Sequence, residues 1–132
     1  MKKQAKRVPW GRTLKTQDNY LGKQKTSSAK VRPVVVIDNN SKNELMVVPL
    51  SSRSGSNRTR LKNYAQGKSY YKHFVEIEDN KGNPIVVGEK FKENHKNMDV
   101  SKRDVQKIRS KVFTSSKQSK RNNELRDKLH KK

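Results

Sequence analysis

The chain has 132 residues, enough for one domain, and only 29% of them are hydrophobic, which is well below the proportion of a little under one half that globular proteins usually show. Its formal net charge is +21, and so basic a chain repels itself unless it meets an anionic partner, of which nucleic acid is the commonest. The chain has no cysteine, which excludes disulfides and thiolate metal sites and suits a reducing cytoplasm, and no apolar stretch approaches the roughly 18 residues that a membrane span needs.

Residues 1–29 read as a basic N-terminal arm. Asp18 is their only acidic residue, and large apolar side chains are scarce among them. High charge with little apolar surface predicts that this arm is mobile without a ligand. Pro9 argues against a central strand in this region. Trp10 either stacks on the bases of single-stranded nucleic acid or packs the arm against the folded core, and the sequence leaves both readings open.

The next stretch, residues 30–52, predicts a buried β-hairpin. Residues 34–37 are four β-branched residues in a row, residues 45–48 are a second apolar run, and turn formers lie between them. Because antiparallel strands bring the start of one beside the end of the next, Arg32 is expected near Ser51 and Ser52. A guanidinium beside two hydroxyls can bind an anion, although ordinary strand-end residues would look the same.

A polar loop is predicted for residues 52–68, and a loop of this length in a small domain is usually functional or disordered. Its cations can contact phosphates and its tyrosine can stack on a base, while a solvated, mobile loop is the alternative. With neighbouring cations and the arm tryptophan, the candidate nucleic-acid-binding residues are Lys30, Arg53, Arg58, Arg60, Lys62, Tyr64, Lys68 and Trp10.

Beyond the loop, alternation over residues 70–77 predicts a third strand, and residues 79–83 a turn in which Gly82 suits a positive φ. Residues 84–87 and 89–92 read as short strands, the second at a sheet edge, so that 70–77 and 84–92 would form a second hairpin.

A helix is predicted from Ser101 to Phe113 because a weak capping box precedes an apolar stripe at positions 105, 108 and 112. This helix should lie across the β core. Residues 114–132 read as a second basic tail, in which Leu125 and Leu129 support no more than a transient helix.

Taken together, VRPVVVIDNN, MVVPLSS, FVEIE and the capped helix resemble the MazF/PemK-like toxins over about residues 30–113. The resemblance implies a mainly β fold with a C-terminal helix, that is, a small SH3-like barrel that carries basic, partly disordered arms at both ends. It also implies a metal-independent endoribonuclease that cuts single-stranded RNA and needs no cofactor. An antitoxin, either an acidic protein or an RNA, would restrain it, and a homodimer is the expected assembly.

Within that resemblance, Arg32 and Ser51 match the family's catalytic pair, and Ser52 is the neighbouring hydroxyl. Their residue types suit a reaction in which the RNA 2′-OH attacks the adjacent phosphate, because a guanidinium and a hydroxyl can stabilise the charge that develops on its oxygens. His73 and His95 are further candidates for proton transfer, since histidine titrates near neutral pH.

Two other functions fit the same residues. The first is a plasmid- or phage-encoded accessory factor that binds RNA or DNA on the same barrel without cleaving it. The second is a ribosome-associated or RNA-packaging protein, which basic arms on a small core also suggest.

Overall fold

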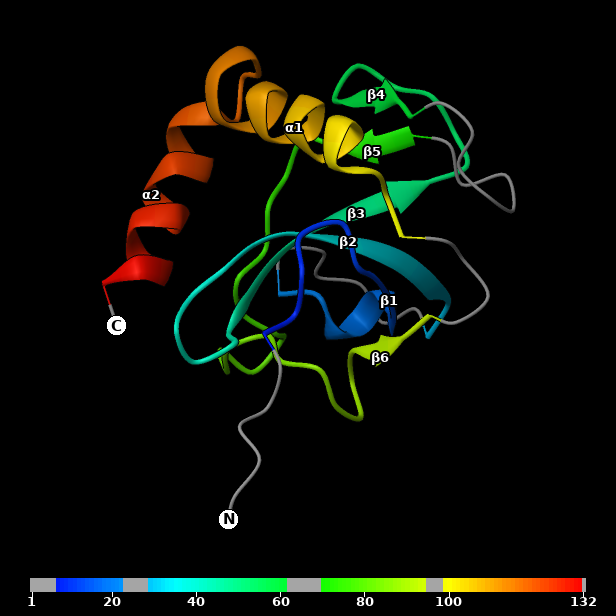
Figure 1. Cartoon of the computed structure of the whole chain (residues 1–132). Coiled ribbons are helices and arrows are strands. Elements are labelled where there is room, and N and C mark those ends of the chain that lie inside the picture. Colours follow the sequence, from blue (N-terminus) through cyan, green and yellow to red (C-terminus); the bar gives the residue numbers. More distant parts are fainter. Residues whose placement is uncertain (1–6, 23–28, 62–69, 95–98, 132) are drawn as a thin grey trace.

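The computed structural model describes residues 7–22, 29–61, 70–94 and 99–131, and these form a mainly β fold followed by helices. Six strands make one antiparallel sheet in the order β4-β5-β3-β2-β1-β6 (Figure 1). The strands are β1 Thr13–Gln17, β2 Val31–Asn39, β3 Leu45–Ser51, β4 Arg58–Arg60, β5 Tyr70–Lys72 and β6 Lys92–Glu93. Within the described residues β4 and β6 pair on one side only and are the sheet edges.

The predicted hairpin of residues 30–52 is confirmed as β2 and β3. Val34 lies opposite Pro49 and Val36 opposite Val47, and the apolar runs are fully buried, as continuous β-branched sequence requires. A β-bulge shifts the register between Val36 and Asp38. The bulge turns Asp38 toward the helices, since its partner is then Met46 on that face.

Each face of the sheet carries its own hydrophobic cluster. Val35, Val48 and Tyr71 lie on the face that the helices cover, where they join Ile108 of the first helix. The opposite face holds a smaller cluster of alternate strand residues, closed by side chains from loops: Leu14, Leu21, Val34, Val36, Leu45, Val47, Ile85 and Phe91. The sheet is therefore buried on both faces along much of β2 and β3.

The first helix confirms the predicted position and cap. It is α1, Lys102–Ser110, and the Ser101 hydroxyl accepts a hydrogen bond from the backbone N–H of Asp104. A π-helical segment, Lys111–Ser115, turns the chain into α2, Ser119–His130. In Figure 1, α1 lies over β4 and β5, and α2 runs down one side of the sheet.

The prediction of at most a transient helix after residue 114 was wrong. Leu129 is only 1% exposed and belongs to the larger cluster. The buried Asn122 amide of α2 donates to the backbone carbonyls of His73 and Val112, at 2.8 Å and 2.7 Å. A helix anchored partly through a buried amide shows only a weak apolar stripe, so periodicity underestimates it.

The N-terminal arm was also predicted wrongly where the structure describes it, because β1 lies between β2 and β6 in the sheet. Gly11, with a φ of 95°, makes the close approach before β1, where an added Cβ would lie 2.4 Å from the carbonyl oxygen of Val100. Residues 1–6 and 23–28 of the predicted arm lie outside the described residues.

Several further strand predictions need correction. Strand β4 lies inside the predicted polar loop, and the regular part of the third strand is short, only Tyr70–Lys72. Beyond it the pairing continues as isolated bridges of Glu76 with Val47 and of Glu78 with Pro84. The predicted turn between Glu78 and Pro84 is confirmed, with Gly82 at a φ of 81°. The strand predicted at 84–87 does not form, because Pro84 and Ile85 make only isolated bridges, and the predicted hairpin of 70–77 with 84–92 is wrong beyond the bridge of Glu78 with Pro84. The edge strand predicted at 89–92 is β6, which overlaps that range only at Lys92 and pairs with β1.

No helix in the described part of the chain is long and apolar enough to cross a membrane. Among the same residues there is also no cluster of three or more His, Asp or Glu side chains that could hold a metal ion.

Candidate nucleic-acid interface

A row of polar and cationic residues crosses the sheet on the face that points away from the helices. Cross-strand partners share a face, so Arg60, Tyr70 and Ser51 stand on one side of the sheet, and Arg32 pairs with Thr16. If the register of Val34 with Pro49 is continued by two residues, Arg32 falls across from Ser51 and the two sets join. The Arg32 side chain also donates to the carbonyl of Leu50, the residue before Ser51. A second pair, Arg58 with Lys72, lies one step along. We call these seven residues the cationic row: Thr16, Arg32, Ser51, Tyr70, Arg60, Arg58 and Lys72.

Arg32 is held rigidly within this row. Its Nε donates to Asp18 Oδ1 at 2.6 Å, and its Nη1 donates to the Leu50 carbonyl at 2.6 Å. The Arg32 and Asp18 side chains are only 14% and 8% exposed, so solvent screens their ion pair weakly. Asp18 begins the short 3₁₀ turn Asp18–Tyr20 after β1. The acid that orients Arg32 therefore comes from the segment predicted to be a free arm.

The two serines differ in environment. Ser51 ends β3, is 5% exposed, and its hydroxyl oxygen accepts a hydrogen bond from the Arg53 backbone N–H at 3.1 Å. A hydroxyl has one donor and two acceptor sites, so this bond leaves the Ser51 proton for another oxygen. Ser52 is exposed at the start of the loop.

Lys72 is a member of the row that sequence reasoning missed. Burial lowers its pKa to about 8, the nearby charges of Arg32 and Arg58 act in the same direction, and Asp18 opposes them. Within the described part of the chain, Arg32, Arg58 and Lys72 therefore lie near one carboxylate, that of Asp18. The alternation of residues 70–77 placed Lys72 on the same face as Tyr70, but the identity of its neighbours depends on β4, which the sequence did not reveal.

Exposure changes along the row. Thr16 and Ser51 at the β1 and β3 end are buried, Tyr70, Lys72 and Arg58 are partly exposed, and Arg60 on the edge strand β4 is exposed. Arg53 in the adjoining loop is exposed as well. An anionic chain can therefore reach the β4 end directly, with Arg32 and Ser51 at the inner end of the same track.

His73 lies apart from this site. Its ring Nε2 is 2.7 Å from the Thr59 hydroxyl, and Thr59 pairs with Tyr71 on the helix-covered face. Burial, reinforced by the charge of Lys111, lowers the pKa of His73 and favours the neutral ring. The structure therefore does not bring His73 together with Arg32 and Ser51, and His95 lies outside the described residues.

Of the remaining candidates from the sequence, Lys30 lies near the row, Trp10 lies apart from it, and the others lie outside the described residues. Lys30 is exposed, and its carbonyl accepts a hydrogen bond from the Asp18 backbone N–H, so Lys30 stands near the inner end of the row. Trp10 is 41% exposed and stacks under the Arg109 guanidinium, with 3.9 Å between the guanidinium carbon and the ring centroid. This contact fits the packing reading of Trp10. Lys62, Tyr64 and Lys68 lie outside the described residues.

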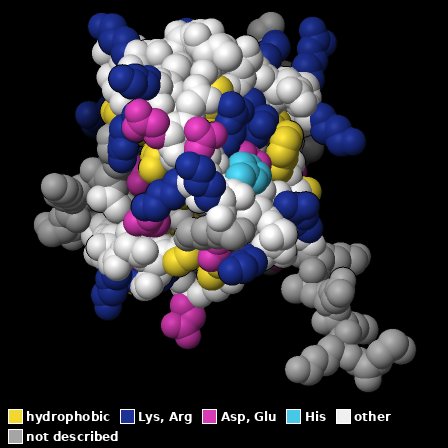
Figure 2. All heavy atoms as spheres, turned by 90° about the vertical axis from the view of Figure 1, so that its left-hand side faces the viewer, with side chains coloured by type: hydrophobic (Ala, Val, Ile, Leu, Met, Phe, Trp, Pro, Cys, Tyr) yellow, Lys and Arg dark blue, Asp and Glu magenta, His cyan; other side chains and the backbone are white. Residues whose placement is uncertain are grey.

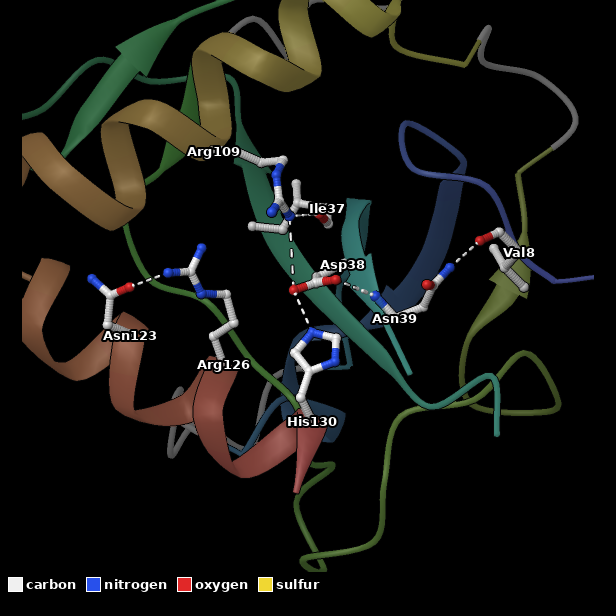
Figure 3. Close-up of polar contacts among 8 residues, drawn as sticks. All are labelled: Val8, Ile37, Asp38, Asn39, Arg109, Asn123, Arg126 and His130. Atoms are coloured by element: carbon white, nitrogen blue, oxygen red, sulfur yellow. Dashed lines mark hydrogen bonds and ion pairs between the residues drawn. The ribbon is translucent and has the colours of Figure 1, made fainter. Parts of the chain in front are cut away.

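A second charged cluster lies under the helices and is shown in Figure 3. The buried carboxylate of Asp38 is 3.8 Å from Arg109 of α1 and 3.0 Å from His130 of α2. Arg109 also donates to the Ile37 carbonyl. The cluster joins both helices to the bulge of β2. Burial, with a smaller contribution from the charge of Arg126, lowers the pKa of Arg109, and Asp38 opposes this shift. Sequence reasoning had assigned Asp38 to the hairpin turn.

The outer surface on the α2 side is mixed in charge. Figure 2 views the molecule from this side and shows Lys and Arg side chains spread over the surface with acidic side chains among them. Lys128 of α2, for example, is 2.6 Å from Glu78. Comparison with models of protein families, with curated proteins and with solved structures finds no match to this chain.

Proposed function

We propose that the protein is a metal-independent endoribonuclease of the toxin–antitoxin type, which binds single-stranded RNA along the cationic row. The observation that carries the proposal is an immobilised guanidinium, Arg32, which is held by Asp18 and by the carbonyl of Leu50, the residue before Ser51, at the inner end of the cationic row. The same proposal assigns the sheet to the SH3-like barrel that the resemblance implies, the site of action to the cytoplasm, and its restraint to an acidic protein or RNA antitoxin.

The reaction asks little more of the protein than positioning and charge. The RNA 2′-oxygen attacks the adjacent phosphorus and gives its proton to solvent, the bond to the 5′-oxygen breaks, and that oxygen takes a proton from solvent. The products are a 2′,3′-cyclic phosphate and a 5′-OH. Three of the five N–H donors of Arg32 form hydrogen bonds to Asp18 and to the Leu50 carbonyl, so two remain for the phosphate oxygens. Donors that are already oriented stabilise the transition state without a reorganisation cost.

The outer part of the row supplies binding. Arg53, Arg58 and Arg60 can contact the phosphates that flank the reacting one, and the partly exposed Tyr70 offers a ring for stacking. Such contacts predict RNA binding that weakens steeply with salt. Replacing the exposed Arg60 with Gln should lower the slope of log K against log salt by about 1, the contribution of roughly one phosphate contact.

The decisive experiment is cleavage of single-stranded RNA by purified protein in excess EDTA. The expected products carry 2′,3′-cyclic phosphate, and RNA with a 2′-deoxy residue at the cut position should resist. Arg32→Ala alone would leave Asp18 buried without its partner, so the double variant Asp18→Asn/Arg32→Gln removes both charges together. Cleavage by this variant should fall by about 10²-fold or more per folded molecule.

Two further variants calibrate that loss. Ser51→Ala should cost less than the double variant, because Ser52 supplies a second hydroxyl one residue away. Arg103→Gln, on the exposed surface of α1, is the matched control and should cleave normally. A pure wild-type protein that binds RNA tightly and cuts none would refute the catalytic proposal.

One observation favours a second candidate, a nucleic-acid-binding protein without catalysis. The Arg32 guanidinium is largely buried and already bonded to Asp18 and Leu50, as a purely structural arginine would be. Such a protein would bind single-stranded DNA and RNA of one sequence with similar affinity, whereas the ribonuclease should prefer RNA because it recognises the 2′-OH.

A further inference from the structure

A pocket opens beside the outer part of the row, between β5 and the loop that follows β3. Residues 54–58 line one side, and Lys72 and Phe74 line the other. Its volume is about 280 Å³, just below the range of about 300–1,000 Å³ that is typical of pockets for larger organic ligands. The pocket is therefore of a size for one small polar group.

The wall of this pocket is built by hydrogen bonds. The Arg58 backbone N–H donates to the Gly55 carbonyl at 3.2 Å, and the His73 backbone N–H donates to the Asn57 carbonyl at 3.0 Å. The Arg58 side chain donates to the Arg53 carbonyl at 3.1 Å. These bonds fold the loop back against β5 and hold it there. The exposed hydroxyls of Ser54 and Ser56 add hydrogen-bond donors to the lining.

The charge around the pocket is unbalanced. Lys72 and Arg58 face each other across the β4–β5 pair, and Arg32 from β2 adds a third positive charge. Asp18, from the turn after β1, is the acidic group that acts on Lys72, and its carboxylate already holds Arg32. Tyr70 is the other titratable side chain on this face of β5, and Arg53 stands in the loop. An anion in the pocket would supply the missing negative charge.

We propose that this pocket holds a backbone phosphate of the bound RNA, with Lys72 and Arg58 as its ligands, and that entry of the phosphate is coupled to protonation of Lys72. The inference rests on the proposed function for the identity of the anion, but not on cleavage. The free protein has a pKa of about 8 at Lys72, so near pH 8 roughly half of the molecules carry a neutral amine there. A phosphate beside it favours the ammonium form.

The test is calorimetry of the full-length protein with a 2′-O-methyl oligoribonucleotide, which keeps the phosphates and cannot be cleaved. Titrations at pH 8 in buffers of different ionisation enthalpy report the protons taken up. We expect an uptake of about half a proton per protein, decreasing toward zero at pH 6.5, where Lys72 is already charged. Sodium sulfate, an oxyanion with no proton to exchange in this range, is the second probe and should compete with the oligonucleotide.

Variants assign the proton to one group. Lys72→Arg keeps the charge at every pH, so it should bind within about threefold of wild type at pH 7 with no proton uptake at pH 8. Lys72→Gln should weaken binding about tenfold and also abolish the uptake. Lys92→Arg, at the exposed end of the sheet on β6, is the matched control and should keep the wild-type uptake.

The outcomes separate this site from the proposed function. Unchanged uptake in Lys72→Arg, or unchanged affinity in Lys72→Gln, would overturn the phosphate site. Proton-linked binding of the oligonucleotide by a protein that cleaves no RNA would support the site and refute the ribonuclease. Binding of sulfate with uptake that depends on Lys72, but no binding of the oligonucleotide, would keep the anion pocket and refute RNA as its ligand.

Discussion

Two regions of this molecule bury charge, and they differ in the groups that contact their cations. Under the helices, the Asp38 carboxylate meets Arg109 and His130, and Arg109 is further engaged by the Ile37 carbonyl and the Trp10 ring. On the opposite face, Lys72 of the cationic row feels the charges of Arg32 and Arg58, and among the described residues Asp18 is the carboxylate that opposes them.

The difference indicates which charges hold the fold and which remain for a ligand. A buried cation with a carboxylate, a carbonyl and an aromatic ring around it has little interaction energy left for a partner. A group of like charges, in contrast, raises the free energy of the folded protein, and binding of an anion or loss of a proton from the lysine lowers it. We therefore propose that the Asp38 cluster serves stability and the cationic row serves binding, and the following variants test that division.

Asp38→Ala should have the largest effect, and on stability alone. It removes the buried carboxylate and leaves Arg109 without its ion-pair partner, at a cost of about 3 kcal/mol or more in the free energy of unfolding. Urea denaturation measures this loss, with the exposed Asp127→Ala of α2 as the control. RNA affinity per folded molecule should be unchanged, and a parallel loss of affinity would contradict the separation of the two regions.

Asp18→Asn should affect the row and spare the helix side. The variant keeps the charge of Arg32 but loses the carboxylate that orients it. Cleavage of single-stranded RNA should fall about tenfold, less than when the charge itself is removed, and affinity should remain at least as high because a negative charge near the phosphate has gone. If cleavage were unaffected, the Arg32–Asp18 pair would be only a structural contact.

Lys72→Gln should stabilise the protein while weakening binding. In the folded state the pKa of Lys72 is about 8, below its ordinary value of 10.5, so the unfolded chain holds more protons between those values and stability rises with pH there. Below pH 8 the lysine is charged in both the folded and the unfolded state, so its charge lowers the free energy of unfolding by the full amount. The variant should gain about 1 kcal/mol at pH 7 after allowance for solvent screening.

The pH dependence is the check on that gain. Thermal unfolding at pH 7 and at pH 10 measures the difference in stability between Lys72→Gln and wild type. This difference should be smaller at pH 10, because the wild-type lysine is largely neutral in the folded protein there. An advantage that is equal at the two pH values would mean that charge at Lys72 is not its cause.

Trp10→Leu should have the smallest effect. It removes the stacking of Arg109 on the ring, a contact worth about 0.5–1 kcal/mol at a partly exposed position. Affinity for single-stranded RNA should not change, because Trp10 lies with the helix-side cluster and outside the row. A drop in affinity of tenfold would revive the alternative in which Trp10 stacks on a base.

Local pattern was a reliable guide where one short segment carries the whole signal. The β-branched run before the turn predicted β2 and its hairpin, the positive φ of Gly82 followed from its turn, and Ser101 capped α1 as expected. Each of these depends on residues within a few positions of one another. The same hairpin geometry also predicted that Arg32 lies near the end of β3, where its Nη1 donates to the Leu50 carbonyl.

Neighbours along the chain decide the hairpin, the cap of α1 and the large positive charge, and all three could be predicted without the fold. Three contacts depend on the folded chain: Asp18 orients Arg32, Asp38 contacts residues of both helices, and Lys72 lies near Arg32 and Arg58. Those contacts join residues from separate strands and helices, and the β-bulge and the short edge strand β4 that create them leave almost no periodic signal in the chain. The effect of a buried charge on stability and binding depends on its neighbours, and only the folded chain brings those neighbours together.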